Sequence, residues 1–330
     1  MPSNHPGQVV AVFITALAII NVFTTQPASS TELFVSGLSN NAVLEYNGST
    51  GAFTRDFVAT GSGGLVSPEG LVFGPNGNLF VASEGSNAVL EYNGTTGTFM
   101  STFASGGGLV NPFGLVFGPN GNLFVGGEGS NDVLEYNGST GTLVSVFVPP
   151  GTGGLSDPQG LAFGRNGDLF VSSLNSSSVL EYNGTTGAFV TDFVQHASGG
   201  LNGPTSLTFG PDGNLYVNNY YGKSVLEYDG TTGAFIRPFV SGGSGGLDGP
   251  IGLVFSSNGN LLVSGQNTVL QYNGTTGAFV NAFVPSGSGG LMGARGLTFA
   301  SVPEPASVLL LGSGLAGLAA WRRKRQSELQ

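Results

Sequence analysis

Residues Gly70–Ser83 read Gly-Leu-Val-Phe-Gly-Pro-Asn-Gly-Asn-Leu-Phe-Val-Ala-Ser, and Ala88–Phe99 follow as Ala-Val-Leu-Glu-Tyr-Asn-Gly-Thr-Thr-Gly-Thr-Phe. Close copies of this stretch recur along the chain. The spacings between the tyrosines of its Leu-Glu-Tyr core, which reads Leu-Gln-Tyr in the last copy, are 46, 44, 46, 46 and 44 residues: Tyr46, Tyr92, Tyr136, Tyr182, Tyr228 and Tyr272. A period of this length with several short strands per repeat is typical of a β-propeller.

Each repeat predicts four antiparallel strands, A to D. Strand A is the apolar run Leu71–Phe73, which ends at Gly-Pro-Asn-Gly-Asn, where proline fixes φ and Asn-Gly supplies the positive φ of a tight turn. Strands B and C are Leu79–Ser83 and Ala88–Tyr92. After Asn-Gly-Thr-Thr-Gly, strand D is Thr98–Ala104, whose phenylalanines share one face by their period of two.

Strand D is predicted to be the outer edge of its blade. The copy at Phe235–Phe239 contains Pro238, which would cost a central strand one ladder hydrogen bond. An edge strand tolerates this loss. Strand A therefore lies at the axis of the ring.

The A strands match the B, C and D strands in number only if the two ends of the propeller meet in one blade. The first repeat supplies strands B, C and D alone, at Leu33–Val35, Ala42–Tyr46 and Ala52–Val58, and the last supplies a lone strand A, Gly296–Phe299. Six A strands begin at Leu71, Leu115, Leu161, Leu207, Leu253 and Leu297. The sequence thus predicts an all-β, six-bladed propeller in which the last A strand pairs with the first B strand and leaves only short outer edges.

The amino-acid composition of the chain restricts the kinds of partner that the protein can bind. Of 330 residues, 40% are apolar and 8% charged, and none is cysteine, so disulfides and thiolate metal sites are excluded. Between Thr31 and Val302 there are 17 acidic and 5 basic side chains, a net charge of −12. An acidic ring without a Lys/Arg stripe argues against nucleic acid or anionic lipid as partner.

The N-terminus carries a predicted secretory signal, residues 1–30. Val9–Phe23 is apolar, and it is followed by Gln26–Ser30, which suits cleavage after Ser30. The propeller domain is predicted at residues 31–301. The remaining domain, residues 302–330, has a short apolar helix at 306–321 and a basic end at 322–325.

This C-terminal order closely resembles the PEP-CTERM sorting signal of Gram-negative bacteria. The residues that carry the resemblance are Pro303, Glu304, Pro305, Arg322, Arg323, Lys324 and Arg325. It implies transient membrane anchoring by the apolar helix and cleavage near Val302–Pro305 by an exosortase-type protease. Delivery to the cell surface or the extracellular, exopolysaccharide matrix is implied to follow.

The repeats resemble NHL-type propellers and, more loosely, the gluconolactonase-like superfamily. The resemblance lies in Gly-Leu-x-Phe-Gly-Pro-[Asn/Asp]-Gly-Asn-Leu-[Phe/Tyr]-Val and covers nearly all of residues 31–300. The resemblance is specific for the propeller fold and says little about activity, since propellers host unrelated functions.

The D–A and B–C loops share one face of the ring, and they are predicted to vary from blade to blade while the A–B and C–D turns of the other face stay uniform. Variable loops on a rigid frame are the usual place for binding. Candidate residues at the axial mouth of this face precede each A strand: Glu69, Phe113, Gln159, Thr205, Ile251 and Arg295. Further candidates from the surrounding loops are Asn111, Asp157, Asn202, Asp248, Glu84, Glu128, Asn175, Asn219 and Gln266.

Catalysis has weaker support. Ca²⁺ or another divalent cation would need several of these oxygens to converge, and Glu69 with Glu84 is the best acidic pair. The series Glu45, Glu91, Glu135, Glu181 and Glu227 repeats evenly around the ring and is predicted to be structural. His196 is the one histidine of the propeller, so a His-based zinc site or a Ser-His-Asp triad is not visible.

The sequence therefore favours an exported, surface- or matrix-associated binding module whose ligand is a glycan, an exopolysaccharide or a protein. Two alternatives remain. One is a metal-dependent lactonase or hydrolase of the gluconolactonase type, for which Glu69-Gly70 fits the first metal-binding Glu while Thr205-Ser206 and Ile251-Gly252 do not match the later motifs. The other is a purely structural component of the matrix.

Overall fold

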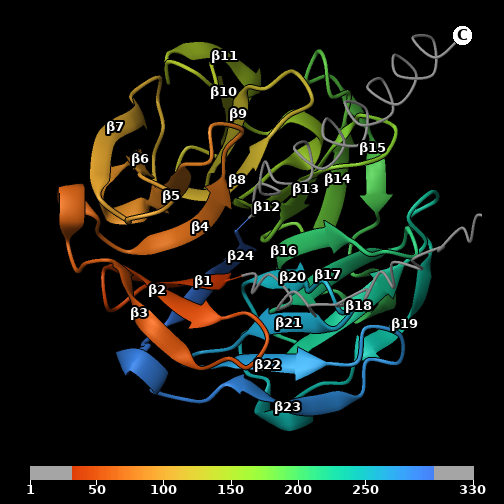
Figure 1. Cartoon of the computed structure of the whole chain (residues 1–330). Helices are drawn as coiled ribbons and strands as arrows, with labels where there is room; N and C mark the ends of the chain where they lie inside the picture. The colour runs from red at the N-terminus through yellow and green to blue at the C-terminus, as the bar shows by residue number, and fades with distance from the viewer. Residues whose placement is uncertain (1–31, 301–330) are drawn as a thin grey trace, which may run out of the picture.

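A ring of six four-stranded antiparallel sheets makes up the part of the chain that the computed structural model describes, residues 32–300 (Figure 1). The predicted six-bladed propeller is confirmed. The A strands lie around the axis, and the D strands form the periphery of the ring (Figure 1). Pro238 is in a D strand, where it pairs with Leu226 on one side and has no neighbour among the described strands on the other.

The blades are numbered along the chain, with the strands of each in the order A to D. Blade 1 is β24 (Ala294–Phe299), β1 (Glu32–Gly37), β2 (Ala42–Asn47) and β3 (Phe53–Val58). Blade 2 is β4 (Pro68–Phe73), β5 (Leu79–Ser83), β6 (Ala88–Tyr92) and β7 (Phe99–Ser105). Blade 3 is β8 (Pro112–Phe117), β9 (Leu123–Gly127), β10 (Asp132–Tyr136) and β11 (Leu143–Val148). Blade 4 is β12 (Pro158–Phe163), β13 (Leu169–Ser173), β14 (Ser178–Tyr182) and β15 (Phe189–Val194). Blade 5 is β16 (Pro204–Phe209), β17 (Leu215–Asn219), β18 (Ser224–Tyr228) and β19 (Phe235–Val240). Blade 6 is β20 (Leu253–Phe255), β21 (Leu261–Ser264), β22 (Val269–Tyr272) and β23 (Phe279–Val284).

Helical structure within residues 32–300 is restricted to 3₁₀ turns of three residues. They are η1 (Ser62–Gly64), η2 (Glu84–Ser86), η3 (Thr152–Gly154), η4 (Ser198–Gly200), η5 (Ser244–Gly246) and η6 (Ser288–Gly290). None of these described helices has the length and apolar character needed to cross a bilayer. The predicted signal peptide (1–30), the apolar helix at 306–321 and the basic end at 322–325 lie outside the described residues.

The ring is closed as predicted, by pairing between its first and last strands. In blade 1, Leu33 is opposite Phe299, Phe34 opposite Thr298 and Val35 opposite Leu297. The backbone N–H of Ala300 continues the contact by donating to the carbonyl of Glu32 at 3.1 Å. The two ends of the described chain therefore meet within one sheet.

The hydrophobic core consists of six clusters, each between two neighbouring blades. Between blades 2 and 3, for example, Phe80 of β5 makes edge-to-face contacts with Phe103 of β7 and Phe117 of β8, at centroid distances of 4.7 and 5.2 Å. Edge-to-face pairs add about 0.5–1.5 kcal/mol each beyond the burial of apolar area. Because every cluster draws on two sheets, no blade buries its apolar surface alone.

The tyrosine that marks each repeat holds a D–A loop in place. All six side chains are fully buried, and each hydroxyl donates to a backbone carbonyl of the loop that enters the same blade. Tyr182 donates to Thr152 at 2.8 Å, and Tyr46 donates across the closure to Ser288 at 2.9 Å. Burial raises the pKa of the Tyr182 phenol well above its usual range. These phenols therefore act as neutral donors.

Replacement of Tyr182 by Phe is expected to lower the free energy of unfolding by about 1 kcal/mol, because one buried hydrogen bond is lost and the Thr152 carbonyl loses its donor. The midpoint of urea unfolding measures this. Tyr221→Phe, at a side chain that is 60% exposed, is the matched control and should leave the midpoint unchanged. Equal midpoints for Tyr182→Phe and the wild type would contradict the assigned role.

One prediction about the loops was wrong. The D–A loops do not vary throughout, because five of the six contain the same 3₁₀ turn, [Ser/Thr]-Gly-Gly-Leu, with a buried leucine at its end. Only the loop at Gly106–Gly108 of blade 2 lacks this helix. In these five turns a phenylalanine of the following D strand packs on the central glycine, as Phe189 does on Gly153, whereas Leu143 takes this place at Gly107. Variation is therefore concentrated in the residues after the buried leucine and in the B–C loops.

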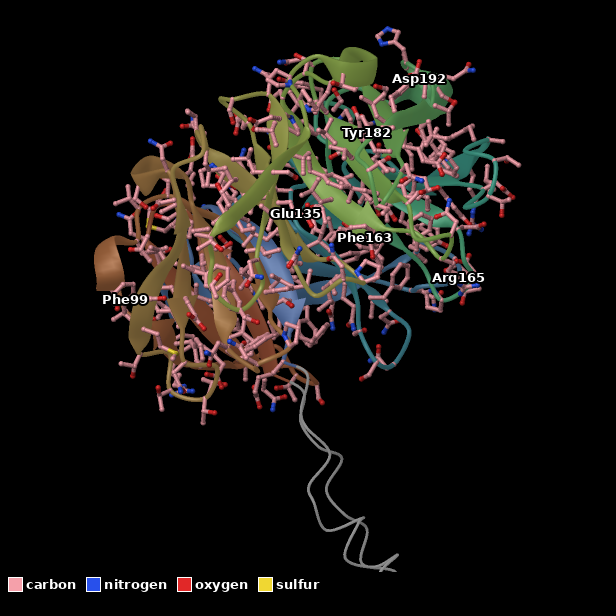
Figure 2. All side chains as sticks on the ribbon, turned by 90° about the horizontal axis from the view of Figure 1, so that it is seen from above. Phe99, Glu135, Phe163, Arg165, Tyr182 and Asp192 are labelled. Carbon is pink, nitrogen blue, oxygen red and sulfur yellow. The ribbon has the colours of Figure 1, made fainter. Side chains whose placement is uncertain are left out.

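The evenly spaced glutamates are hydrogen-bonded within their own blades, as expected for structural residues. Glu135 accepts from the side-chain amides of Asn120 and Asn122 in the A–B turn, at 2.9 and 2.8 Å, and from the Ser145 hydroxyl of the D strand at 3.2 Å. Figure 2 shows Glu135 and Tyr182 among the strands, while Arg165 projects from an A–B turn at the surface. These carboxylates therefore stabilise turns on the face of the ring that carries the A–B and C–D turns.

Candidate functional site

Six side chains at the ends of the A strands surround the axis on the loop face. They are the residues predicted for the axial mouth, Glu69, Phe113, Gln159, Thr205, Ile251 and Arg295, and all of them line one pocket with a volume of about 400 Å³. We refer to it as the mouth pocket. Beneath it, the axial channel narrows to a space of about 130 Å³ lined by one leucine from each A strand, Leu71 and Leu297 among them.

Ten of the fifteen candidate residues line the mouth pocket. The loops contribute Glu84, Glu128, Asp157 and Asn175 in addition to the six axial residues. Five candidates lie elsewhere, and most of them have a contact of their own. Asp248 pairs with Lys223 at 2.9 Å, Gln266 approaches Asp248, Asn219 donates to Gly200 and Ser224, and the backbone N–H groups of Asn111 and Asn202 bond to Asn87 and Asn219.

Four lining residues were not predicted from the sequence: Leu38, Leu174, Tyr220 and Tyr221. The two tyrosines follow β17 in the B–C loop of blade 5, with their rings edge-to-face at 5.1 Å. Tyr221 is 60% exposed, and the ring of Tyr220 packs against Gly249. The signal was present in the sequence, because Tyr-Tyr in this loop has no counterpart in the other blades.

The backbone of the mouth is held by polar side chains of the B strands. Ser36 donates to the Glu69 carbonyl at 2.5 Å, and Ser264 donates to the Arg295 carbonyl at 2.7 Å. Asn218 donates to the Ile251 carbonyl at 3.0 Å, and Ser172 bonds to the carbonyl of Thr205. Each donor belongs to the blade before its acceptor. The mouth side chains are therefore presented from a fixed frame.

Glu69 and Arg295 meet across the closure of the ring. Arg295 Nε of β24 lies 3.3 Å from Glu69 Oε1 of β4, and the Glu69 residue is only 4% exposed. Within residues 32–300, the other carboxylate oxygen, Oε2, has no hydrogen-bond partner. Burial raises the pKa of Glu69 to about 8, with Arg295 opposing the shift and the Glu84 and Glu128 carboxylates adding to it.

The acidic side chains around Glu69 also influence one another. Burial raises the pKa of Glu128, and the neighbouring carboxylates of Asp157 and Glu84 raise it further. Burial raises the pKa of Asp157 as well, although the Gln159 amide donates to it at 2.6 Å and lowers it in part. The pocket thus concentrates negative charge with one guanidinium to balance it.

Glu69 is expected to make the protein less stable as the pH rises. The folded protein keeps a proton on Glu69 up to about pH 8, whereas the unfolded chain loses it near pH 4.5. The free energy of unfolding therefore falls between these values, by at most about 1.4 kcal/mol per pH unit. Glu69→Gln should flatten this part of a plot of unfolding midpoint against pH.

Glu84→Gln is the control for this experiment. It removes one carboxylate that raises the Glu69 pKa, so the fall should end at a lower pH than in the wild type. Parallel pH profiles for the wild type and Glu69→Gln would show that Glu69 is not the titrating group.

The described residues give no support to a cation site at Glu69 and Glu84. No group of three or more Asp, Glu or His side chains in residues 32–300 is arranged to hold a metal ion. Glu69 instead faces a guanidinium. Among the described residues, acidic and histidine side chains alone therefore do not supply the three or more converging ligands that a cation would need.

Comparison with known proteins identifies one segment of the chain. Residues 301–325 match the model of the PEP-CTERM protein-sorting motif. The predicted sorting residues Pro303 to Pro305 and Arg322 to Arg325 lie within this match, outside the described residues. The motif implies that the protein is exported and processed by an exosortase.

The propeller is similar in structure to several solved proteins. A chain of the nidogen/laminin complex aligns over 82% of this chain and 98% of its own, with 14% identity and a TM-score of 0.63. A protein of unknown function from Bacteroides caccae aligns over 83% and 100%, with 16% identity and a TM-score of 0.64. Virginiamycin B lyase from Staphylococcus aureus aligns over 76% and 80%, with 14% identity and a TM-score of 0.56. No curated protein matches significantly in sequence. At such identities the likeness shows the fold alone.

Proposed function

We propose that this protein is an exported, surface- or matrix-associated propeller that binds a ligand, a glycan or exopolysaccharide in the first place, in the mouth pocket. The observation that carries the proposal is the pocket itself: residues of all six blades surround one cavity of about 400 Å³ on the loop face. The exposed aromatic ring of Tyr221 and partly buried carboxylates occur together there, as they do in sites that recognise polar organic molecules.

The rest of the proposal concerns transport. Residues 1–30 act as a signal peptide, and the helix at 306–321 anchors the chain in the membrane until cleavage near Val302–Pro305. The product is retained at the cell surface or in the extracellular matrix of a Gram-negative bacterium. The PEP-CTERM match supports this order of events. We also propose that the repeats are of the NHL type, on the run Gly-Leu-x-Phe-Gly-Pro.

Binding is favoured over catalysis by the position of the histidine. One of the related lyase structures is a catalytically inactive histidine-to-alanine variant of virginiamycin B lyase bound to quinupristin. In this chain His196 is exposed in a D–A loop, its Nδ1 2.8 Å from the Ser176 carbonyl, and it does not line the mouth pocket. We therefore propose binding, and neither a lyase nor a lactonase activity, for the mouth pocket.

A glycan and exopolysaccharide array probed with the propeller tests the proposal. Residues 32–300 contain every blade and the closing strand, so this fragment is suited to the assay. Tyr221→Ala, in the mouth pocket, should weaken binding at least several-fold. Arg165→Ala, in an A–B turn of the opposite face (Figure 2), should not. Binding that is lost only in Arg165→Ala would place the site on the other face, and absence of any binding would favour a structural role.

A further inference from the structure

The mouth pocket is chemically two-sided. Its acidic residues come from three consecutive blades: Glu69 and Glu84 from blade 2, Glu128 from blade 3 and Asp157 from blade 4. The tyrosine pair comes from blade 5, which stands opposite blade 2 in a ring of six. A ligand that fills the pocket therefore meets carboxylates on one side and an exposed aromatic ring on the other.

The acidic side has four carboxyl groups but only one guanidinium, Arg295, and one amide that donates to it, Gln159. Within residues 32–300, Glu69 Oε2 and the neighbouring Arg295 Nε are both buried without a hydrogen-bond partner, and a buried polar atom in this state is costly. Arg295 is the one cation among the residues that line the pocket, facing four carboxyl groups. An ammonium group supplies what is missing, because it carries one positive charge and three N–H donors on a compact centre.

The side of the pocket that carries Tyr220 and Tyr221 is suited to stacking against a ligand ring that presents C–H groups on one face. Tyr221 is 60% exposed and stands edge-to-face to Tyr220, which in turn packs against Gly249, so the platform is held from behind. A tyrosine face also attracts a cation that lies within about 6 Å of its centroid. Amides at the edge, from Asn175 and the buried Gln159, can bond to hydroxyl groups.

We propose that the ligand of the mouth pocket is a saccharide that carries free amino groups. Its ammonium group lies among Glu69, Glu84, Glu128 and Asp157, and a sugar ring stacks on Tyr221. This inference rests on the proposed function and adds the ligand class to it. Binding of the cation lowers the pKa of Glu69, so the complex releases a proton when it forms near neutral pH.

Glucosamine oligomers and N-acetylglucosamine oligomers of equal length are the paired probes, since acetylation removes the charge and keeps the ring. Calorimetry at about pH 6 should show the amino form binding at least about tenfold more tightly than the acetylated form. Glu128→Gln should weaken binding of the amino form about tenfold and leave the acetylated form unchanged. Asp192→Asn, which removes the same charge from the outer strand β15 (Figure 2), should change neither.

The outcomes separate the ligand class from the binding function. Equal binding of both oligomers, with a loss in Tyr221→Ala, would overturn the amino-sugar assignment and keep the pocket as a glycan site. Equal weakening by Glu128→Gln and Asp192→Asn would show general charge attraction and overturn it too. Binding of a lysine-rich peptide without binding of either oligomer would overturn the saccharide, and binding of no probe in calorimetry or on the glycan array would overturn both proposals.

Discussion

Deletion of residues 294–300 is expected to prevent the propeller from forming a soluble monomer. Without β24, the strand β1 becomes an unpaired edge at the axis that carries Leu33, Phe34 and Val35 in sequence. The cluster between blades 1 and 6 loses Ala294 and Leu297. An exposed apolar edge of this kind promotes pairing with other chains. Size-exclusion chromatography with light scattering should therefore show larger, polydisperse assemblies for the deletion variant than for the full ring.

A circular permutant is the control for this deletion. Residues 294–299 are placed ahead of residues 33–293, joined by a copy of the natural A–B turn Gly74–Asn78, so that blade 1 acquires the connectivity of blade 2. This protein keeps every strand pair and should fold with an unchanged near-UV circular dichroism spectrum. A monomeric, cooperatively folded deletion variant would show that β24 does not close the ring.

Gly187→Ala is expected to destabilise the propeller strongly, as is the same change at the equivalent glycines of the other C–D turns. Gly187 ends an Asn-Gly-Thr-Thr-Gly turn with φ 70°, and a Cβ at this position would overlap the backbone carbonyl of Phe147 in the neighbouring blade. Strain at positive φ costs about 1–3 kcal/mol and overpacking a similar amount. The free energy of unfolding should fall by roughly 2–6 kcal/mol in denaturant titration.

Gly151→Ala separates the cost of backbone strain from the cost of the steric overlap between blades. Gly151 has a similar φ of 74°, but the space where its Cβ would stand is open. Only the backbone strain applies, so the free energy of unfolding should fall by about 1 kcal/mol. Equal losses in the two variants would show that the close approach between blades at Gly187 contributes nothing.

The blades were predictable because their pattern is local. Proline and Asn-Gly at the A–B turn, alternation in the strands and the equal spacing of the tyrosines each depend on residues close in sequence. The structure reproduces strands B and C of the second blade at Leu79–Ser83 and Ala88–Tyr92. Strand A, in contrast, begins earlier than its apolar run, at Pro68, because the residues before the glycine pair with the end of the B strand at Ser83.

The sequence predicted which residues lie at the axis of the ring, but it did not predict which side chains are neighbours there. A residue two positions before the first leucine of each A strand lies at the axis, so the six mouth residues were found from the sequence. The two tyrosines of blade 5 were missed because they lie in a B–C loop, whose length and path decide whether a side chain reaches the axis. Asn219 was included for its position, yet it faces the loop backbone at Gly200 and the Ser224 hydroxyl.

The sequence by itself determined the number of blades, their strand order and the strands that close the ring, because repetition converts local turn and strand preferences into one global count. The tertiary structure alone decided that Glu69 is buried against Arg295, with a raised pKa and one oxygen that has no partner among residues 32–300. It also decided that the tyrosines of blade 5 stand across the mouth pocket from Glu69 and Glu84 of blade 2. Burial and electrostatic neighbours arise between segments far apart in the chain, which meet only when the ring has closed.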